Sequence, residues 1–219
     1  MKLLIVALAL AYSAGLNLYA TIGLLGLGAR AGMVDLPGSL TWVTSPWVIV
    51  LVMILFALEF AATLLPGVSS AWETLHSVIR PPAAAVLAAA VVWSEDPVVV
   101  LAAALLGGLL AVVVHTAQLG MRYAIDSKQN ARTGLIANVL ELLLVAGVVV
   151  LVWSYPAATL LAALAVLVAF MLVARVAVRA LQQVFTGHWM PGCGLLQEAR
   201  TATASSPSLP DEEERDSNY

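Results

Sequence analysis

The sequence predicts an all-α fold, a polytopic membrane helix bundle with about six transmembrane helices. Of the 219 residues, 62% are hydrophobic and only 11% are charged, whereas soluble domains are about half apolar and about a quarter charged. The mean hydropathy is +0.97, and several apolar runs approach the length of about 20 residues that a helix needs to cross a bilayer. The single cysteine, Cys193, excludes a disulfide framework.

Six apolar segments are candidate transmembrane spans, at residues 3–29, 46–65, 82–94, 97–119, 134–153 and 157–181. The first follows Met1-Lys2 and resembles the start of a signal peptide. Its apolar run is about twice as long as the hydrophobic region of a signal peptide, so we expect this segment to be retained. Ser94 to Pro97 and Tyr155-Pro156 each divide a long apolar run, which is typical of the turn in a helical hairpin.

The distribution of Lys and Arg predicts the orientation, because cytoplasmic loops of membrane proteins carry an excess of these residues. The side that includes the N-terminus collects Lys2, Arg80, Arg122, Lys128, Arg132, Arg179, Arg200 and Arg215. The opposite side holds Arg30 and the acidic pair Glu95-Asp96. We therefore expect a multi-pass protein whose N- and C-termini are both cytoplasmic.

Residues 69–80 are expected to form a short helix on the membrane surface. Ser70 and Glu73 have the spacing of a capping box at its start, and Pro81-Pro82 would end it. One face is apolar, as in helices that lie on a bilayer, and carries Val68, Trp72, Leu75 and Ile79. The helix is either a gate or a simple amphipathic connector. The candidate interface or gate residues are Trp72, His76, Arg80 and Arg122.

Residues 1–186 are expected to form the transmembrane helical domain, and residues 187–219 a disordered acidic cytoplasmic tail. The segment from 211 to 216 alone holds five of the thirteen acidic residues. Low hydrophobicity with clustered charge cannot offset the entropy lost on ordering. No basic patch interleaved with aromatic residues occurs in the sequence, so nucleic-acid binding is not expected.

A faint internal repeat suggests two halves in the membrane domain. Each set of matching residues precedes an apolar helix that contains Leu-Glu, and three spans per half would give a 3+3 inverted repeat, as in many secondary transporters. Such glycine matches also arise by chance. The glutamates of the two Leu-Glu pairs, Glu59 and Glu141, lie at equal depths, whereas a strict inverted repeat would place them at mirror-image depths. The matches, 92 residues apart, are Gly15, Leu27, Gly28 and Arg30 with Gly107, Leu119, Gly120 and Arg122.

Two carboxylates, Glu59 and Glu141, lie inside apolar runs, where an ionisable group costs about 2.5–3.5 kcal/mol at the bilayer centre. Each lies seven residues, or about 10 Å, from the cytoplasmic end of its helix, and His115 lies at the same depth in the fourth span. If the three helices converge, these groups form a polar pocket that is open toward the cytoplasm. Gln118 and Asn138 lie one turn from His115 and Glu141.

These polar residues have structural as well as functional interpretations. A buried glutamate can stay protonated and bridge to a neighbouring helix, and His115 has a structural alternative too. Asn17 lies among small residues at the centre of the first span, where glycines favour either close helix packing or a helix break beside a cavity. The candidate substrate-pathway or binding residues are Glu59, Glu141, His115, Asn17, Gln118 and Asn138.

No metal or cofactor is expected, because the sequence lacks the close His, Cys and Glu spacings of metal sites. It also contains no nucleophile elbow, phosphate loop or HExxH motif. We therefore expect no enzymatic activity, and an intramembrane enzyme is only the third hypothesis.

Several motifs occur together in this chain: Ser13 to Tyr19, Leu58-Glu59-Phe60 with Pro66-Gly67-Val68, Trp72 to His76, Ile79-Arg80-Pro81, His115 to Arg122 and Leu140-Glu141. Together they resemble an integral membrane family catalogued as domain of unknown function 4126, over roughly residues 5–185. The resemblance implies a bacterial inner-membrane protein with several spans and no established activity. The chain departs from the family pattern at Thr63-Leu64, where an Asp-Lys pair is usual, at Gln118, where a lysine is common, and at Leu142, where an acid often follows the glutamate. These differences reduce the charge of any pocket.

The leading hypothesis is a small bacterial inner-membrane transporter, permease or lipid flippase, in which Glu59 and Glu141 line the path and His115 modulates them. Its expected partners are the lipid bilayer and a small-molecule, ion or lipid substrate. The alternative is a non-transporting membrane scaffold or assembly partner in which the glutamates are structural. The Ala- and Gly-rich helix faces could also pack against a second copy of the chain, so a homodimer is a further expected assembly.

Overall fold

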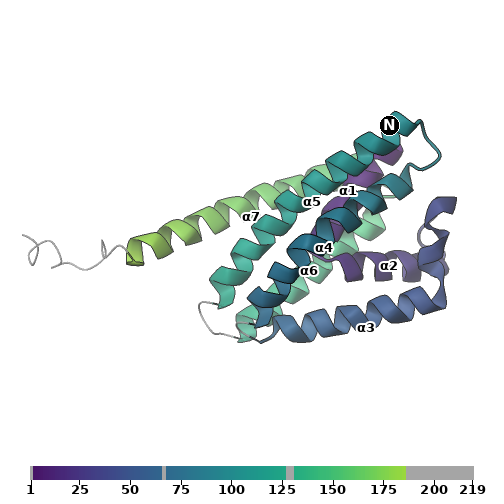
Figure 1. Cartoon of the computed structure of the whole chain (residues 1–219). Helices are drawn as coiled ribbons and strands as arrows, with labels where there is room; N and C mark the ends of the chain where they lie inside the picture. Colours follow the sequence, from purple (N-terminus) through teal and green to yellow (C-terminus); the bar gives the residue numbers. More distant parts are fainter. Residues whose placement is uncertain (1, 66–67, 127–130, 186–219) are drawn as a thin grey trace, which may run out of the picture. The chain divides into compact units, whose positions relative to one another are not determined.

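The computed structural model describes residues 2–65, 68–126 and 131–185, which are helical apart from their connections (Figure 1). These residues form α1 (Lys2–Leu16), α2 (Leu18–Arg30), the 3-10 helix η1 (Gly38–Thr44), α3 (Pro46–Thr63), α4 (Val68–Val91), α5 (Pro97–Asp126), α6 (Ala131–Leu151) and α7 (Pro156–Phe185). Residues Met1–Arg175 form one compact unit, which contains the whole site described below. The expected acidic tail, residues 187–219, lies outside the described residues.

The all-helical prediction is confirmed for the described ranges, which hold no strand. Four helices are long and apolar enough to cross a membrane, namely Pro46–Thr63, Ala71–Val91, Pro97–Tyr123 and Arg132–Leu151. Shorter apolar helices cover Lys2–Leu16, Leu18–Arg30 and Pro156–Ala169. The count of six spans and the inverted repeat stay predictions. The segments that carry the repeat differ, since the first is interrupted and the second lies in one continuous helix, α5.

Two helices occupy residues 3–29, where the sequence predicts one span, because the chain breaks at Asn17. This residue has an extended backbone (φ −144°, ψ 103°), and its Oδ1 accepts a hydrogen bond of 2.8 Å from the N–H of Ala20. Asparagine is a preferred N-cap, and the bond satisfies one of the free N–H groups at the start of α2. As a result α2 leaves the direction of α1 and packs along α3 (Figure 1).

The surface helix expected at residues 69–80 is wrong, because α4 continues through Pro81 and Pro82. Proline removes a backbone donor, but membrane helices tolerate it where neighbouring helices pack against them. Here α5 approaches closely, since a Cβ atom on Gly107 would lie only 2.7 Å from the Cβ of Ala88. The predicted surface helix and the short third span are therefore parts of one helix.

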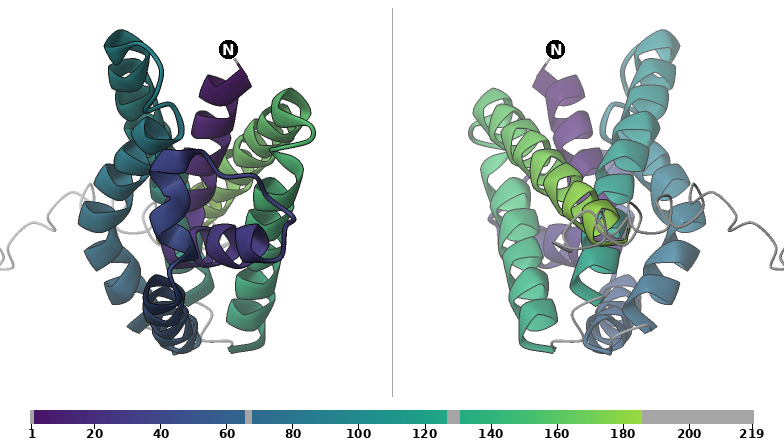
Figure 2. Two further views of the ribbon diagram at one scale, coloured as in Figure 1. Left: turned by 90° about the vertical axis from the view of Figure 1, so that its right-hand side faces the viewer. Right: turned by 90° about the vertical axis from the view of Figure 1, so that its left-hand side faces the viewer.

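α1 lies at the centre of the unit, between the α4–α5 pair and α6 (Figure 2). Ten of its residues, from Val6 to Leu16, are buried. Small residues allow the close approach that drives helix association in membranes: a Cβ atom on Gly15 would lie 2.9 Å from the Cα of Ala111 in α5. Both sequence interpretations of the glycine-rich first segment are thus found, close packing at Gly15 and a helix break at Asn17.

α3 presents most of its apolar side chains outward. Among its residues only Val52, Glu59 and Thr63 are buried, whereas Trp47 is 83% exposed. An apolar exterior with a polar buried face is the pattern of a helix that contacts lipid, because a charged side chain avoids the hydrocarbon. This arrangement turns Glu59 toward the centre of the unit.

Candidate functional site

Five charged side chains from four helices meet in the interior, and we call them the charged core. They are Glu59 of α3, Glu73 and Arg80 of α4, Arg122 of α5 and Glu141 of α6. Their side chains are between 0% and 11% exposed. Ionised groups at such burial are costly unless they are paired, so the pairing of each group defines what the core can do.

Arg80 is the centre of the charged core. Its Nη1 donates hydrogen bonds to Glu73 Oε2 at 2.8 Å and to Gln118 Oε1 at 2.6 Å. Its Nη2 donates to Glu59 Oε1 and, at 3.4 Å, to Glu73 Oε1. The planar guanidinium can serve several acceptors at once, so Arg80 joins α3, α4 and α5.

Glu141 is the second centre and accepts three side-chain hydrogen bonds. Arg122 Nη2 donates to its Oε2 at 2.8 Å, and Gln118 Nε2 donates to the same oxygen at 2.7 Å. Asn17 Nδ2 donates to its Oε1 at 3.1 Å. Gln118 therefore bridges the two centres, because its oxygen accepts from Arg80 while its nitrogen donates to Glu141.

His115 contacts the charged core as a neutral imidazole. Its Nδ1 lies 3.2 Å from Nη1 of Arg80, which can only donate, so Nδ1 is the acceptor. Its Nε2 lies 3.1 Å from the carbonyl oxygen of Glu73, which can only accept, so Nε2 carries the proton. The hydroxyl of Ser77, 2.9 Å from the same nitrogen, completes its surroundings. His115 therefore adds no charge in this arrangement.

The charged core has a formal charge of −1, because its three carboxylates face two guanidinium groups. The nearby His76 is not a member of the charged core. Its Nδ1 lies 2.8 Å from the carbonyl oxygen of Trp72, and its Nε2 lies 3.1 Å from the hydroxyl of Tyr19. A net negative charge in apolar surroundings favours one compensating positive charge. The arrangement can thus bind one proton or one cationic group.

The helix break adds a further element beside Glu141. Asn17 caps the N-terminus of α2 and also donates to Glu141, so the positive end of the α2 dipole lies next to this carboxylate. Interrupted helices whose ends point at charged groups form the binding sites of many secondary transporters. The break and the charged core therefore belong to one site.

A small cavity of about 10 Å³ lies beside both carboxylates, Glu59 and Glu141. Three residues on its wall each carry one buried polar atom without a hydrogen-bond partner among the described residues: Glu59 Oε2, Arg122 Nη1 and Asn138 Oδ1. A cavity of this size holds about one water molecule. Water can donate to both oxygens and accept from the guanidinium, so it matches the two acceptors and one donor.

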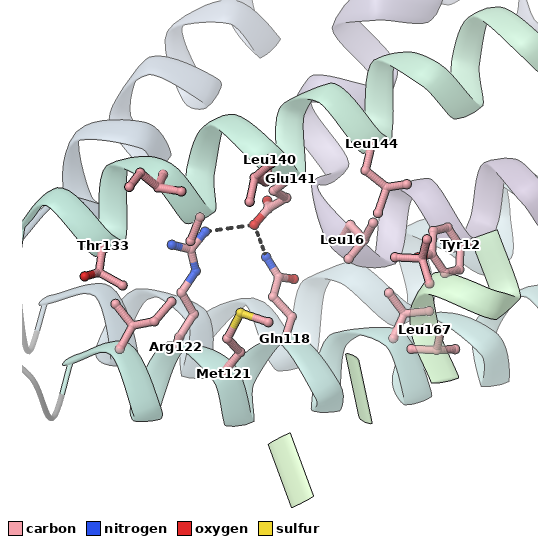
Figure 3. A pocket seen from close by; sticks show the side chains of 15 residues that line it. Tyr12, Leu16, Gln118, Met121, Arg122, Thr133, Leu140, Glu141, Leu144 and Leu167 are labelled. Carbon is pink, nitrogen blue, oxygen red and sulfur yellow. Dashed lines mark hydrogen bonds and ion pairs between the residues drawn. The ribbon is translucent and has the colours of Figure 1, made fainter. Parts of the chain in front are cut away.

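A much larger cavity of about 500 Å³ adjoins the other side of Glu141 (Figure 3). Its walls come from α1, α5, α6 and α7 and are mostly apolar, with Gln118, Arg122 and Glu141 as a polar group joined by hydrogen bonds. Apolar cavities with a few convergent polar groups are the usual form of small-molecule sites. This cavity is therefore the candidate binding site.

The structure brings together most of the predicted pathway residues. Glu59, His115 and Glu141 join one hydrogen-bond network through Arg80 and Gln118. They do not line one common pocket, however, since the large cavity contacts Glu141 but not Glu59 or His115. Asn17 and Asn138 both lie on the wall of the small cavity.

The predicted interface or gate residues lie in the interior rather than at a surface. Arg80, His76 and Arg122 are at most 4% exposed. Trp72 stacks on His76 with ring centroids 5.0 Å apart. A helix end at Pro81-Pro82 predicts a surface position, whereas the continuous α4 carries these residues into the unit.

Glu73 is the main residue that the sequence interpretation missed. It was assigned to the cap of a surface helix, but its side chain is fully buried and pairs with Arg80. The signal was present in the sequence, because positions seven apart lie on the same side of a continuous helix. The sequence interpretation also missed two neighbours of the site. Tyr19 forms a hydrogen bond with His76, and Thr63 accepts one from Asn138.

The fold and the site define a class, an α-helical membrane protein whose helices enclose a charged core. The chain belongs to the family described as "Domain of unknown function (DUF4126)", whose profile matches residues 4–176. The resemblance predicted from the sequence motifs is thereby confirmed. No curated protein and no solved structure matches the chain.

Proposed function

We propose that the chain is a small transporter, permease or lipid flippase of the bacterial inner membrane, with Glu59 and Glu141 on the path. The observation that carries this proposal is the formal charge of −1 in a core formed by four helices. A purely structural network gains nothing from an unbalanced charge, since burying it costs stability. A site that takes up and releases one positive charge needs such an imbalance.

The interrupted α1–α2 segment supports the same proposal. It places a helix N-terminus and Asn17 beside Glu141, in the manner of transporter sites. In this proposal α1 with α2 makes one crossing, α7 makes another, and the four longer spans complete six. Both termini are then cytoplasmic, in agreement with the distribution of Lys and Arg.

The experiment is charge translocation by the purified chain in proteoliposomes, recorded while ions, metabolites and lipids are offered in turn. We expect a current with a substrate, and we expect Glu59→Gln/Glu141→Gln to abolish it while the protein keeps its helical content and elution volume. Glu95→Gln is the matched control, because Glu95 is exposed in the α4–α5 connection. Unchanged transport in the double variant would refute the proposal.

A membrane scaffold or assembly partner is the second candidate. The observation that favours it is the degree of internal pairing, since Arg80 and Glu141 each have at least three side-chain partners within the chain. Under this function a partner that copurifies would stay bound to the Glu59→Gln/Glu141→Gln variant. Loss of the partner together with the charges would count against it.

A further inference from the structure

The large cavity has an apolar end and a polar end. Arg122 lies near the C-terminal end of α5, and Thr133 lies near the N-terminal end of α6. Leu144 lies about three turns further along α6, and it faces Tyr12 and Leu167 at the far end of the cavity (Figure 3). A ligand that fills this space therefore needs a polar head and an apolar tail.

The size of the cavity suits one chain rather than a whole bilayer lipid. Its volume of about 500 Å³ lies within the range of about 300–1,000 Å³ that is usual for small-molecule sites. Its walls are apolar apart from the group around Glu141, Thr133 and the hydroxyl of Tyr12. A single alkyl chain with a compact headgroup matches this shape.

The cavity borders the surface that contacts lipid. Three of the apolar residues on its wall, Ile136, Leu140 and Val166, are 60%, 61% and 40% exposed. All of them lie on α6 or α7, in segments apolar enough to lie within a bilayer. An amphiphile dissolved in the membrane can therefore reach the cavity sideways, without crossing an aqueous phase.

The charge of the site selects the sign of the headgroup. Glu141 is 11% exposed, whereas the other members of the charged core are at most 4% exposed. Arg122 and Glu141 both line the cavity, but the carboxylate is the more exposed of the two, and the core as a whole carries a formal charge of −1. A cationic headgroup would bring that charge to zero, whereas an anionic headgroup would make it −2.

We propose that this cavity binds a single-chain amphiphile with an ammonium headgroup, which enters from the bilayer and places its positive charge against Glu141. The inference rests on the proposed function, because it names the substrate class of that transporter. Arg122 and Gln118 then release Glu141 in part, and the ammonium group takes their place as its partner. No covalent step is involved.

The test is equilibrium binding to the purified chain in nanodiscs of uncharged phosphatidylcholine, with dodecyltrimethylammonium as the probe and dodecanoate as the chain-matched anion. We expect saturable binding of the ammonium probe, with dodecanoate at least about tenfold weaker, because a hydrogen bond or contact between charges is worth about that much. Equal or tighter binding of dodecanoate would overturn the proposal.

Two variants on one helix locate the site. Leu144→Trp fills the cavity, and we expect it to weaken binding of the probe by about tenfold or more. Leu143→Trp is the matched control, because Leu143 is 63% exposed and does not line the cavity, so we expect unchanged binding. Equal affinity of both variants would overturn the location.

The outcomes separate this inference from the proposed function. Binding of the ammonium probe that Leu144→Trp abolishes, without charge translocation, supports the site and refutes transport. Charge translocation of another substrate that Leu144→Trp leaves unchanged supports transport and refutes the amphiphile site.

Discussion

Replacement of Arg80 by glutamine is the most direct test of the charged core. The Arg80 guanidinium is 0% exposed and serves Glu59, Glu73 and Gln118. Its removal changes the formal charge of the core from −1 to −2. Loss of one partner from a buried ion pair costs about 3–5 kcal/mol, and the partial hydrogen bonding of the new amide offsets little of this. We expect Arg80→Gln to lower the free energy of unfolding by about 3–5 kcal/mol.

The assay is reversible unfolding of the purified protein in mixed micelles, with increasing fractions of a denaturing detergent. The control is Arg30→Gln, because Arg30 is exposed and its hydrogen bond within the described residues, 3.2 Å to the carbonyl oxygen of Thr44, is exposed as well. We expect this control to change stability by less than about 0.5 kcal/mol.

A second variant distinguishes a charge effect from a packing effect. Arg80→Gln/Glu73→Gln restores the formal charge of −1, so we expect it to be more stable than the sum of the two single changes by about 0.5–3 kcal/mol. A loss below about 1 kcal/mol for Arg80→Gln, or strict additivity in the double variant, would show that the five charges do not act as one core.

Four further substitutions test the surroundings of the core in the same assay. Gly15→Ala should cost about 1–3 kcal/mol because its Cβ would meet the backbone of Ala111, whereas Gly120→Ala, with open space around it, should be neutral or up to about 1 kcal/mol more stable. Equal effects of the two would contradict the close approach. Asn17→Ala should cost about 1–3 kcal/mol, since it removes both the cap of α2 and a hydrogen bond to a carboxylate. Asn138→Leu should stay within about 1 kcal/mol of the wild type, because the lost hydrogen bond is offset by removal of a buried oxygen that has no protein partner among the described residues; a loss as large as that of Asn17→Ala would contradict this account.

Depth along the helices was readable from the sequence. Counting residues from the helix ends put Glu59, His115 and Glu141 in one layer, and the structure joins them in one network. A helix that crosses a bilayer has little freedom to shift along its axis, so the depth of a residue follows from its position in the helix. Counting says nothing about rotation, so it did not reveal that Glu141 alone of the three lines the large cavity, whereas Glu59 and Glu141 share the small one.

The helix boundaries were less predictable, because tertiary packing overrides the local signals that usually end a helix. Pro81-Pro82 usually ends a helix in water, but the close contact with α5 at Gly107 and Gly108 lets α4 continue. Asn17 is too small a signal in a run of apolar residues to predict a break. Its amide N–H also donates to Glu141, a residue so distant in the sequence that no local pattern indicates the contact.

Gln118 has a consequence for communication across the core. Its amide is held in one orientation, because a flip would set its NH₂ group against the donors of Arg80 and its oxygen against the carboxylate of Glu141. An amide neither gains nor loses a proton near neutral pH, so it interrupts any proton wire between Glu59 and Glu141 along this route. Gln118 can instead transmit a change in the position of Glu141 to Arg80. When a ligand pulls Glu141 away, Gln118 either moves with it or loses its hydrogen bond to Glu141. If Gln118 moves, its hydrogen bond to the Arg80 guanidinium changes, so a displacement at Glu141 reaches the other end of the charged core.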